Sequence, residues 1–149
     1  MKIIKGDLIK LAIKGEFDVI IHGCNCFCTM GAGIAKQIKE NFPEAYIKDT
    51  QTVKGDKTKL GSYTWVKAED YKIIIVNAYT QYHYSGLGVL VDYEAIKLIF
   101  RSIKKEFKGL KIGYPAIGAG LAGGNWKKIS DIINQELKGE NHTFVEFDG

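Results

Sequence analysis

The sequence predicts an α/β protein, with a three-layer α/β/α sandwich built around a mixed, largely parallel central sheet. Short apolar runs rich in β-branched residues, such as Val19–Ile21, alternate along the chain with longer stretches of helical periodicity, such as Tyr93–Phe107. Strands that alternate with helices in this way form a sheet covered by helices on its faces. The chain has 149 residues and shows no internal repeat or interdomain linker. We therefore expect one domain spanning residues 1–149.

The elements follow from the same patterns taken in chain order. Strands are expected at Lys2–Lys5, Val19–His22, Ser62–Lys67, Lys72–Asn77, Lys111–Tyr114 and His142–Phe147. Helices are expected at Leu8–Lys14, Ile34–Asn41, Glu44–Thr52, Tyr93–Phe107 and Trp126–Leu137. Pro43 ends the second helix because the residue before a proline is pushed away from helical geometry. Gly109 and Gly139 follow the last two helices, where glycine is a common C-terminal cap.

Composition and charge narrow the class of protein. Apolar residues make up 46% and charged residues 26% of the chain, which is typical of a globular protein. The net charge of +4 favours an anionic ligand without indicating nucleic acid. No apolar run approaches the roughly 20 residues of a membrane span, and residues 1–10 lack the apolar core of a signal peptide. We expect a cytoplasmic monomer that does not bind membranes.

Cys24, Cys26 and Cys28 alternate along one segment, and a metal site is one interpretation of this spacing. Against it, the chain has no second cysteine pair, and His22 is expected on the opposite face of the extended strand. An odd number of cysteines also argues against a disulfide framework. We expect these thiols to pack in a crowded loop, with no metal and no cofactor.

The stretch from Val19 to Ala35 is predicted to form a strand, a glycine loop and the start of a helix. This arrangement points backbone N–H groups and a helix N-terminus at an anion, usually a phosphate. In parallel sheets, ligands bind beyond the carboxyl ends of the strands. Three irregular loops follow apolar strands, at Gly23–Gly33, Ala78–Val89 and Pro115–Gly124. We expect them to converge on one cleft suited to a ligand with phosphates and a flat or sugar-like end.

Four segments, taken in order, resemble a macrodomain over nearly the whole chain. They are KGDL at residues 5–8, HGCNCFCTMGAGIA at 22–35, NAYTQ at 77–81 and YPAIGAGLAGGNW at 114–126. The His-x-Cys-Asn-Cys pattern is most similar to the yeast-type ADP-ribose-1″-phosphate phosphatases and their bacterial and phage relatives. The resemblance implies a protein that binds ADP-ribose and hydrolyses ADP-ribose-1″-phosphate to ADP-ribose and phosphate.

The resemblance also implies which residues bind the ligand. Asp7 falls where macrodomains bind the adenine amino group, Leu8 supplies the next backbone N–H, and Asn25 falls near the distal ribose. The pyrophosphate loops fall on Gly31, Ala32, Gly33 and Ile34 and on Gly118, Ala119, Gly120, Leu121 and Ala122, and Tyr79 is also assigned to the binding site. Two alternatives remain from the residues alone: Asp7 as a helix N-cap, and Asn25 as a turn residue that bonds its own backbone.

For catalysis, His22 and Asn25 are the candidates that the phosphatase group implies. An imidazole that titrates near neutrality can move a proton, although a buried structural histidine is the alternative. The glycohydrolase branch uses a lysine and an aspartate at positions that match Ala78 and Ala122, which argues against its mechanism here. Asn125 stands where many relatives carry aspartate, and we expect it to cap the last helix.

Two further functions remain open. The chain is also compatible with a non-catalytic reader of free or conjugated ADP-ribose, or with a hydrolase that removes ADP-ribose from a conjugate. Nucleic-acid binding is a weaker alternative, because Tyr79, Tyr82 and Tyr84 supply aromatic rings but the lysines look dispersed.

Overall fold

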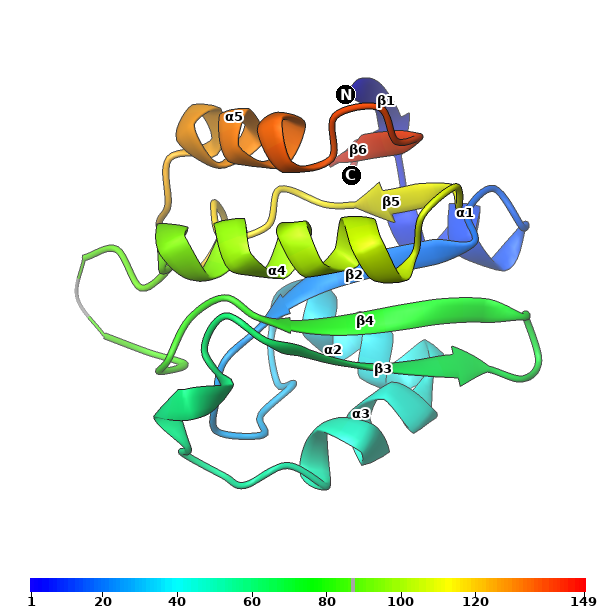
Figure 1. Cartoon of the computed structure of the whole chain (residues 1–149). Coiled ribbons are helices and arrows are strands. Elements are labelled where there is room, and N and C mark those ends of the chain that lie inside the picture. The colour runs from blue at the N-terminus through cyan, green and yellow to red at the C-terminus, as the bar shows by residue number, and fades with distance from the viewer. Residues whose placement is uncertain (87) are drawn as a thin grey trace.

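A computed structural model describes residues 1–86 and 88–149 and contains a six-stranded sheet in the order β1-β6-β5-β2-β4-β3 (Figure 1). The strands are β1 (Lys2–Gly6), β2 (Val19–Cys24), β3 (Tyr63–Ala68), β4 (Ile73–Tyr79), β5 (Ile112–Tyr114) and β6 (His142–Phe147). Neighbouring strands pair in parallel except β3, which runs antiparallel to β4. The expected mixed, largely parallel sheet is confirmed.

Helices cover both faces of this sheet. They are α1 (Leu8–Ile13), α2 (Gly33–Asn41), α3 (Pro43–Thr50), α4 (Tyr93–Glu106) and α5 (Trp126–Glu136), with a short 3₁₀ helix η1 (Lys57–Lys59). Figure 1 shows α4 in front of the sheet and α2 behind it. Strand β2 alternates between two cores: Val19 and Ile21 pack with α4 and α5, whereas Ile20 packs with α1, α2 and α3. The three-layer sandwich is therefore confirmed.

Strands β2 and β4 both run two residues further than we expected. Their parallel pairing continues through His22 with Asn77, Gly23 with Ala78 and Cys24 with Tyr79. Polar and small residues at the strand ends do not interrupt the pairing of β2 with β4, because the backbone N–H and C=O groups still form hydrogen bonds between the strands. The irregular loops after these strands consequently begin at residues 25 and 80.

The pairing also corrects the expected placement of His22 relative to the cysteines. Residues two apart on a strand share a face, so His22 and Cys24 lie on the same side of β2. The Cys24 Sγ atom lies 3.6 Å from His22 Nε2. Their common face is the one that carries Ile20 and packs toward α3, because Asn77, the partner of His22, donates from Nδ2 to the Ala45 carbonyl at 2.9 Å.

Candidate functional site

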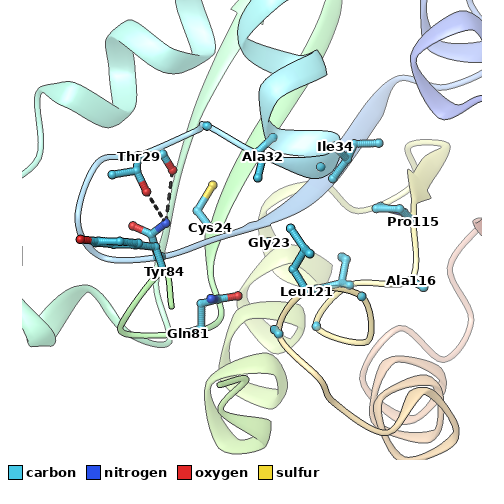
Figure 2. A pocket seen from close by; sticks show the side chains of 18 residues that line it. Gly23, Cys24, Thr29, Ala32, Ile34, Gln81, Tyr84, Pro115, Ala116 and Leu121 are labelled. Atoms are coloured by element: carbon cyan, nitrogen blue, oxygen red, sulfur yellow. Dashed lines mark hydrogen bonds between the residues drawn. The ribbon is translucent and has the colours of Figure 1, made fainter. Parts of the chain in front are cut away.

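A cavity of about 540 Å³ opens at the carboxyl ends of β2, β4 and β5 (Figure 2). All three expected loops contribute to it, so their predicted convergence is confirmed. The lining residues are Gly23, Cys24, Asn25, Thr29, Gly31–Ala35, Gln81, Tyr84, Pro115–Gly118 and Gly120–Ala122. Figure 2 shows Ala32, at the start of α2, on one wall and Leu121 on the other.

A second cavity of about 390 Å³ continues the first toward the other end of the site. Four residues line both cavities: Gly33, Ile34, Pro115 and Ala116. The second cavity is also lined by Asp7, Leu8, Gln37 and residues 144–147, so it brings α1 and β6 to the site. Together the two cavities form one groove, with Asp7 at one end and Gln81 and Tyr84 at the other.

The N-terminus of α2 faces this groove without a side-chain cap. Its N-cap residue is Ala32, which makes no capping hydrogen bond; α3 also lacks a side-chain cap, whereas α1, α4 and α5 are capped by Asp7, Asp92 and Asn125. The first N–H groups of a helix have no partner within the helix and carry its positive dipole end. The uncapped end of α2 therefore leaves backbone donors in the cavity wall, ready for an anion.

Four glycines of the two loops, Gly31, Gly118, Gly120 and Gly124, fall into two kinds. A Cβ atom at Gly31 or Gly120 would meet no protein atom within 4 Å, and neither residue has a positive φ. Gly118 and Gly124 are needed by the fold instead, since a Cβ there would lie 2.6 Å from Val91 or 2.5 Å from the Gly118 carbonyl. Because Gly31 and Gly120 have no side chain, a ligand can approach the backbone of the cavity wall closely at these two positions.

Asp7 caps a helix and also lines the groove. Its Oδ1 atom accepts a hydrogen bond from the Lys10 N–H at 3.1 Å, so Asp7 caps α1, and the residue also lines the second cavity. The cap is confirmed, and the contact with an adenine stays a prediction.

Asn25 lines the first cavity, but its amide is engaged within its own loop. Its Nδ2 donates to Thr29 Oγ1 at 2.7 Å and to the Thr29 carbonyl at 3.2 Å, and its Oδ1 accepts from the Phe27 N–H at 2.8 Å. Figure 2 shows the two bonds that reach Thr29. Asn25 therefore bonds its own turn, as the alternative interpretation held, and shapes the wall beside Thr29.

His22 does not reach the cavity. Its side chain is 1% exposed, and its Nε2 atom lies 2.7 Å from Asn77 Oδ1. Burial lowers the pKa of His22 to about 4, despite the opposing hydrogen bond to Asn77. A neutral, enclosed imidazole is poorly placed to exchange a proton with a bound phosphate near pH 7, so these features favour a structural role for His22, and its catalytic role stays a prediction. Buried polar side chains such as His22 and Asn77 are accommodated in the core because they hydrogen-bond to each other.

Tyr79 and Ala119 line neither cavity. The Tyr79 ring is buried beneath the site, where its hydroxyl donates to Asp49 Oδ1 at 2.8 Å. Burial raises the pKa of this hydroxyl, and the neighbouring Asp49 carboxylate acts in the same direction. Tyr79 lies on the inward face because β4 extends to it, a strand residue that we had expected in a loop. The assignment of Tyr79 to the binding surface is corrected accordingly.

Gln81, Thr29 and Tyr84 line the cavity and were missed as site residues. Gln81 is the last residue of the NAYTQ segment, and it extends toward the cavity, whereas Ala78 is buried in the core. The Gln81 Nε2 atom donates to the His83 carbonyl at 2.8 Å. Gln81, and not Ala78, is thus the first residue after β4 to line the cavity.

The three thiols pack under the first loop. Cys24 also touches the cavity, but burial raises the pKa of its thiol well above the usual value, so it is not an activated nucleophile. Cys26 Sγ donates to the Gln81 carbonyl at 3.6 Å, and Cys28 Sγ to the Asp49 carbonyl at 3.3 Å. Within residues 1–86 and 88–149, no group of three or more metal-binding side chains comes together. Nor is any helix in these ranges long and apolar enough to cross a membrane.

Comparison with known proteins identifies a family and several relatives. Residues 21–133 match the family model described as Macro domain. The chain is 39% identical over 141 residues to a 17.5-kDa protein from the tk–vs intergenic region of Enterobacteria phage T4, covering 90% of this chain and 88% of that protein. It is 26% identical to an ADP-ribose 1″-phosphate phosphatase of Lodderomyces elongisporus, covering 91% of each. It is 24% identical to a DNA ADP-ribosyl glycohydrolase of Mycobacterium tuberculosis, covering 86% of this chain but 36% of that protein.

Solved structures share the fold. The macrodomain of Mycobacterium tuberculosis DarG superposes with a TM-score of 0.78 at 20% identity, covering 98% of this chain and 95% of that one. Thermosipho africanus DarTG, solved in complex with ADP-ribose, superposes with a TM-score of 0.77 at 21% identity, covering 97% of this chain and 40% of that one.

Proposed function

Because the chain belongs to the Macro domain family, we propose that it binds ADP-ribose along the groove formed by its two cavities. The adenine lies at the Asp7 end, the pyrophosphate between the two glycine loops, and the distal ribose near Thr29 and Gln81. This direction agrees with the family resemblance and with the charges along the groove.

The uncapped N-terminus of α2 is the observation that carries this proposal. Its first two residues, Gly33 and Ile34, line the groove at its middle, where the two cavities meet, and Ala35 lines the first cavity. Backbone N–H groups at a helix start bind a pyrophosphate through hydrogen bonds and the helix dipole together. Gly31 and Gly120 leave open space on either side of that position, so the ligand can approach the backbone closely.

Charge supports the direction of the ligand. Asp7 and Glu146 both line the second cavity, and carboxylates there would repel a phosphate but can accept hydrogen bonds from an adenine amino group. At the far end of the first cavity, Thr29 and Gln81 offer neutral polar groups suited to ribose hydroxyls. The groove therefore favours a ligand with a basic or amino-bearing end, an anionic middle and a sugar end.

Calorimetric titration tests the proposal directly. We expect ADP-ribose to bind with a dissociation constant in the micromolar range, about −8 kcal/mol or weaker. AMP should bind far more weakly, because it lacks the second phosphate and the distal ribose. No heat and no thermal shift at millimolar ADP-ribose would refute the proposal.

Hydrolysis of ADP-ribose-1″-phosphate is a second proposal, supported by the names of the yeast relatives. A phosphate on the distal ribose would lie near Asn25, Thr29 and Gln81. Of the described residues lining the first cavity, the titratable ones are Cys24 and Tyr84. Backbone donors can stabilise charge on the phosphate, and the Gln81 amide can orient a water molecule, as glutamine does in GTPases.

This second proposal predicts slow turnover, since no histidine or carboxylate of the described lining stands at the distal end to move a proton. A phosphate-release assay with ADP-ribose-1″-phosphate measures this turnover. The Gln81→Ala variant tests in the same assay whether the Gln81 amide orients the water molecule. Binding of ADP-ribose without release of phosphate would instead support a reader. Release of ADP-ribose from a conjugate would support the third alternative, a de-ADP-ribosylating hydrolase.

A further inference from the structure

Cys28 differs from the other two cysteines of the first loop. Cys24 and Cys26 are buried, whereas Cys28 is partly exposed and lines neither cavity. Its sulfur lies where the loop after β2 meets the end of α3 and the helix η1, on the lower side of Figure 1. A serine could make the same hydrogen bond to the Asp49 carbonyl. Neither the groove nor the core therefore explains why this position carries a thiol.

A buried ammonium group lies beside this thiol. Lys59 is only 8% exposed, and its Nζ atom donates to Thr52 Oγ1 at 2.8 Å and to Cys28 Sγ at 3.7 Å. In the described part of the chain, neither of the two salt bridges involves Lys59. Buried lysines are normally paired with an acid, because an unpaired charge is costly to remove from water. Lys59 thus lacks the close counter-charge that a buried ammonium usually has.

The buried carboxylate of Asp49 does not supply this counter-charge at close range. Its Oδ1 atom accepts a hydrogen bond from the Tyr79 hydroxyl at 2.8 Å. Burial raises the pKa of the Asp49 carboxyl, although the bond to Tyr79 and the more distant charge of Lys59 oppose this shift. The Cys28 sulfur is therefore the atom next to Lys59 at which a new oxygen atom or negative charge could pair with the ammonium.

We propose that Cys28 is a modification site for hydrogen peroxide, which converts its thiol into a sulfenic acid held beside Lys59. Reactive cysteines are partly exposed and lie in positively charged surroundings, as Cys28 does. The sulfur attacks one peroxide oxygen, so an S–O bond forms and the O–O bond breaks. The leaving hydroxide takes up the thiol proton and becomes water. The sulfur is oxidised by two electrons, which reduce the peroxide, and Lys59 and Thr52 can hydrogen-bond to the new oxygen.

The other two thiols are poorly placed to convert this sulfenic acid into a disulfide. Cys26 Sγ donates to the Gln81 carbonyl in the loop after β4, whereas Cys28 Sγ donates to the Asp49 carbonyl in α3. Cys24 is buried beside His22. We therefore expect the sulfenic acid to persist until a small thiol reduces it. Two small thiols restore Cys28 and yield one disulfide and one water molecule.

Trapping with dimedone, which reacts with sulfenic acids, tests this inference. The reduced 149-residue chain is treated with hydrogen peroxide and dimedone, and peptide mass spectrometry measures the labelling of each cysteine. We expect Cys28 to be labelled on the order of tenfold faster than Cys24 or Cys26. In urea the three cysteines should react at similar rates, which controls for intrinsic reactivity. Equal labelling of all three in the folded protein would overturn the inference.

Variants of Lys59 test whether its charge is responsible. Lys59→Met keeps the apolar stem but removes the charge, so it should slow the labelling of Cys28 on the order of tenfold, whereas Lys59→Arg should largely retain the rate. Lys57→Met, at an exposed position of the same helix η1, is the matched control and should not change the rate. Melting temperatures establish that each variant is folded.

A folded Lys59→Met variant that is labelled as fast as the wild type would show that the ammonium has no part in the reaction. Equal slowing in folded Lys59→Met and Lys59→Arg would also contradict a role for the charge. If either variant fails to fold, the rate of Cys28 relative to the two buried cysteines in the wild type still decides whether Cys28 is the modification site.

Oxidation of Cys28 should also affect the groove, and this step rests on the proposed function. Thr29, the next residue, lines the first cavity and accepts a hydrogen bond from Asn25. A sulfenic acid turned toward Lys59 loses the bond to the Asp49 carbonyl that fastens this loop to α3. We expect ADP-ribose affinity to fall about two- to tenfold, the equivalent of one hydrogen bond. Cys28→Ser should bind ADP-ribose equally before and after peroxide treatment.

The two measurements fail independently. If the reduced protein does not bind ADP-ribose, the proposed function is wrong, and mass spectrometry alone still decides whether Cys28 is modified. Selective labelling of Cys28 with unchanged affinity would confirm the modification site and refute its effect on the groove. A loss of affinity that peroxide also causes in Cys28→Ser would assign that effect to another residue.

Discussion

Gly31 and Gly120 carry no side chain although the surrounding protein leaves room for one. We expect Gly31→Ala and Gly120→Ala to leave the free energy of unfolding unchanged or to raise it by about 0.4–1 kcal/mol, because alanine restricts the unfolded chain. Each should nevertheless weaken ADP-ribose binding, since the new methyl group projects into the groove. Melting temperature and calorimetry on the same samples check both effects.

Gly124→Ala is the matched control for these two variants. Its Cβ would lie 2.5 Å from the Gly118 carbonyl, so this variant should lose stability whether or not a ligand is present. If Gly120→Ala destabilised the protein as much as Gly124→Ala, the open space at Gly120 would not be an adaptation for a ligand.

Asp7 requires two substitutions because it has two roles. Asp7→Ala should lower the free energy of unfolding by about 1 kcal/mol through loss of the α1 cap. If its carboxylate also accepts a hydrogen bond from the adenine, affinity for ADP-ribose should fall by about 1.5–3 kcal/mol. Asp7→Asn retains a capping side chain, so it should keep the melting temperature while losing the charge-assisted part of the binding. Unchanged affinity in both variants would remove Asp7 from the site.

At the scale of elements, the N-terminus of α2 offers a direct test of the pyrophosphate position. Ala32 has extended backbone geometry, with φ −147° and ψ 160°, which suits an N-cap side chain. Both Ala32→Ser and Ala32→Asp should therefore cap α2 and stabilise the protein by about 1 kcal/mol.

The two caps differ in what they do to the ligand. Ala32→Asp adds a negative charge where the pyrophosphate would lie, so it should abolish detectable ADP-ribose binding, whereas the neutral Ala32→Ser should weaken binding less. Equal affinity of the two variants in calorimetry would place the phosphates away from α2.

The helices were predictable where the hydrophobic period is clear, as in α4, where Ile96, Ile99, Phe100 and Ile103 are all buried, and strands such as β4 were predictable as short apolar runs. The convergence of the three loops followed from parallel strands ending at one edge of the sheet. The ends of β2 and β4 were not predictable, because backbone pairing continued through polar residues such as His22 and Asn77. Because β4 extends to Tyr79, the side chain of Tyr79 points into the core and not into the cavity.

The candidate site was predictable where its residues belong to sequence motifs, and not where their position depends on strand ends or on the fold of a loop. The glycine loops and Asp7 were found because they belong to sequence motifs, and the structure places them along one groove. His22 and Tyr79 were assigned to the site because they lie next to those motifs in sequence, but their strands direct them toward α3. Gln81 ends the NAYTQ segment and Tyr84 lies in the aromatic loop, but neither was assigned to the site, because their access to the cavity depends on how the loop after β4 folds.

At the scale of the whole molecule, buried histidines couple stability to pH. Burial lowers the pKa of His22 and of His142 to about 4, and His142 Nδ1 lies 2.7 Å from the Tyr114 hydroxyl. Below an ordinary histidine pKa of about 6.5, the unfolded chain gains protons that the folded protein does not. The free energy of unfolding must therefore fall as the pH decreases from about 6.5 toward 4, and it is fully retained above that window.

We expect the fully buried His22 alone to account for a loss of about 2 kcal/mol between pH 7 and pH 5, with a further loss in the same direction from His142. Urea unfolding at pH 7, 6 and 5 measures this loss. His22→Gln should be less stable than the wild type at pH 7, because glutamine fits the buried site poorly, but its stability should depend less on pH. A wild-type stability that stays flat from pH 7 to pH 5 would mean that His22 takes up a proton in the folded protein, and would return it to consideration as an acid–base group.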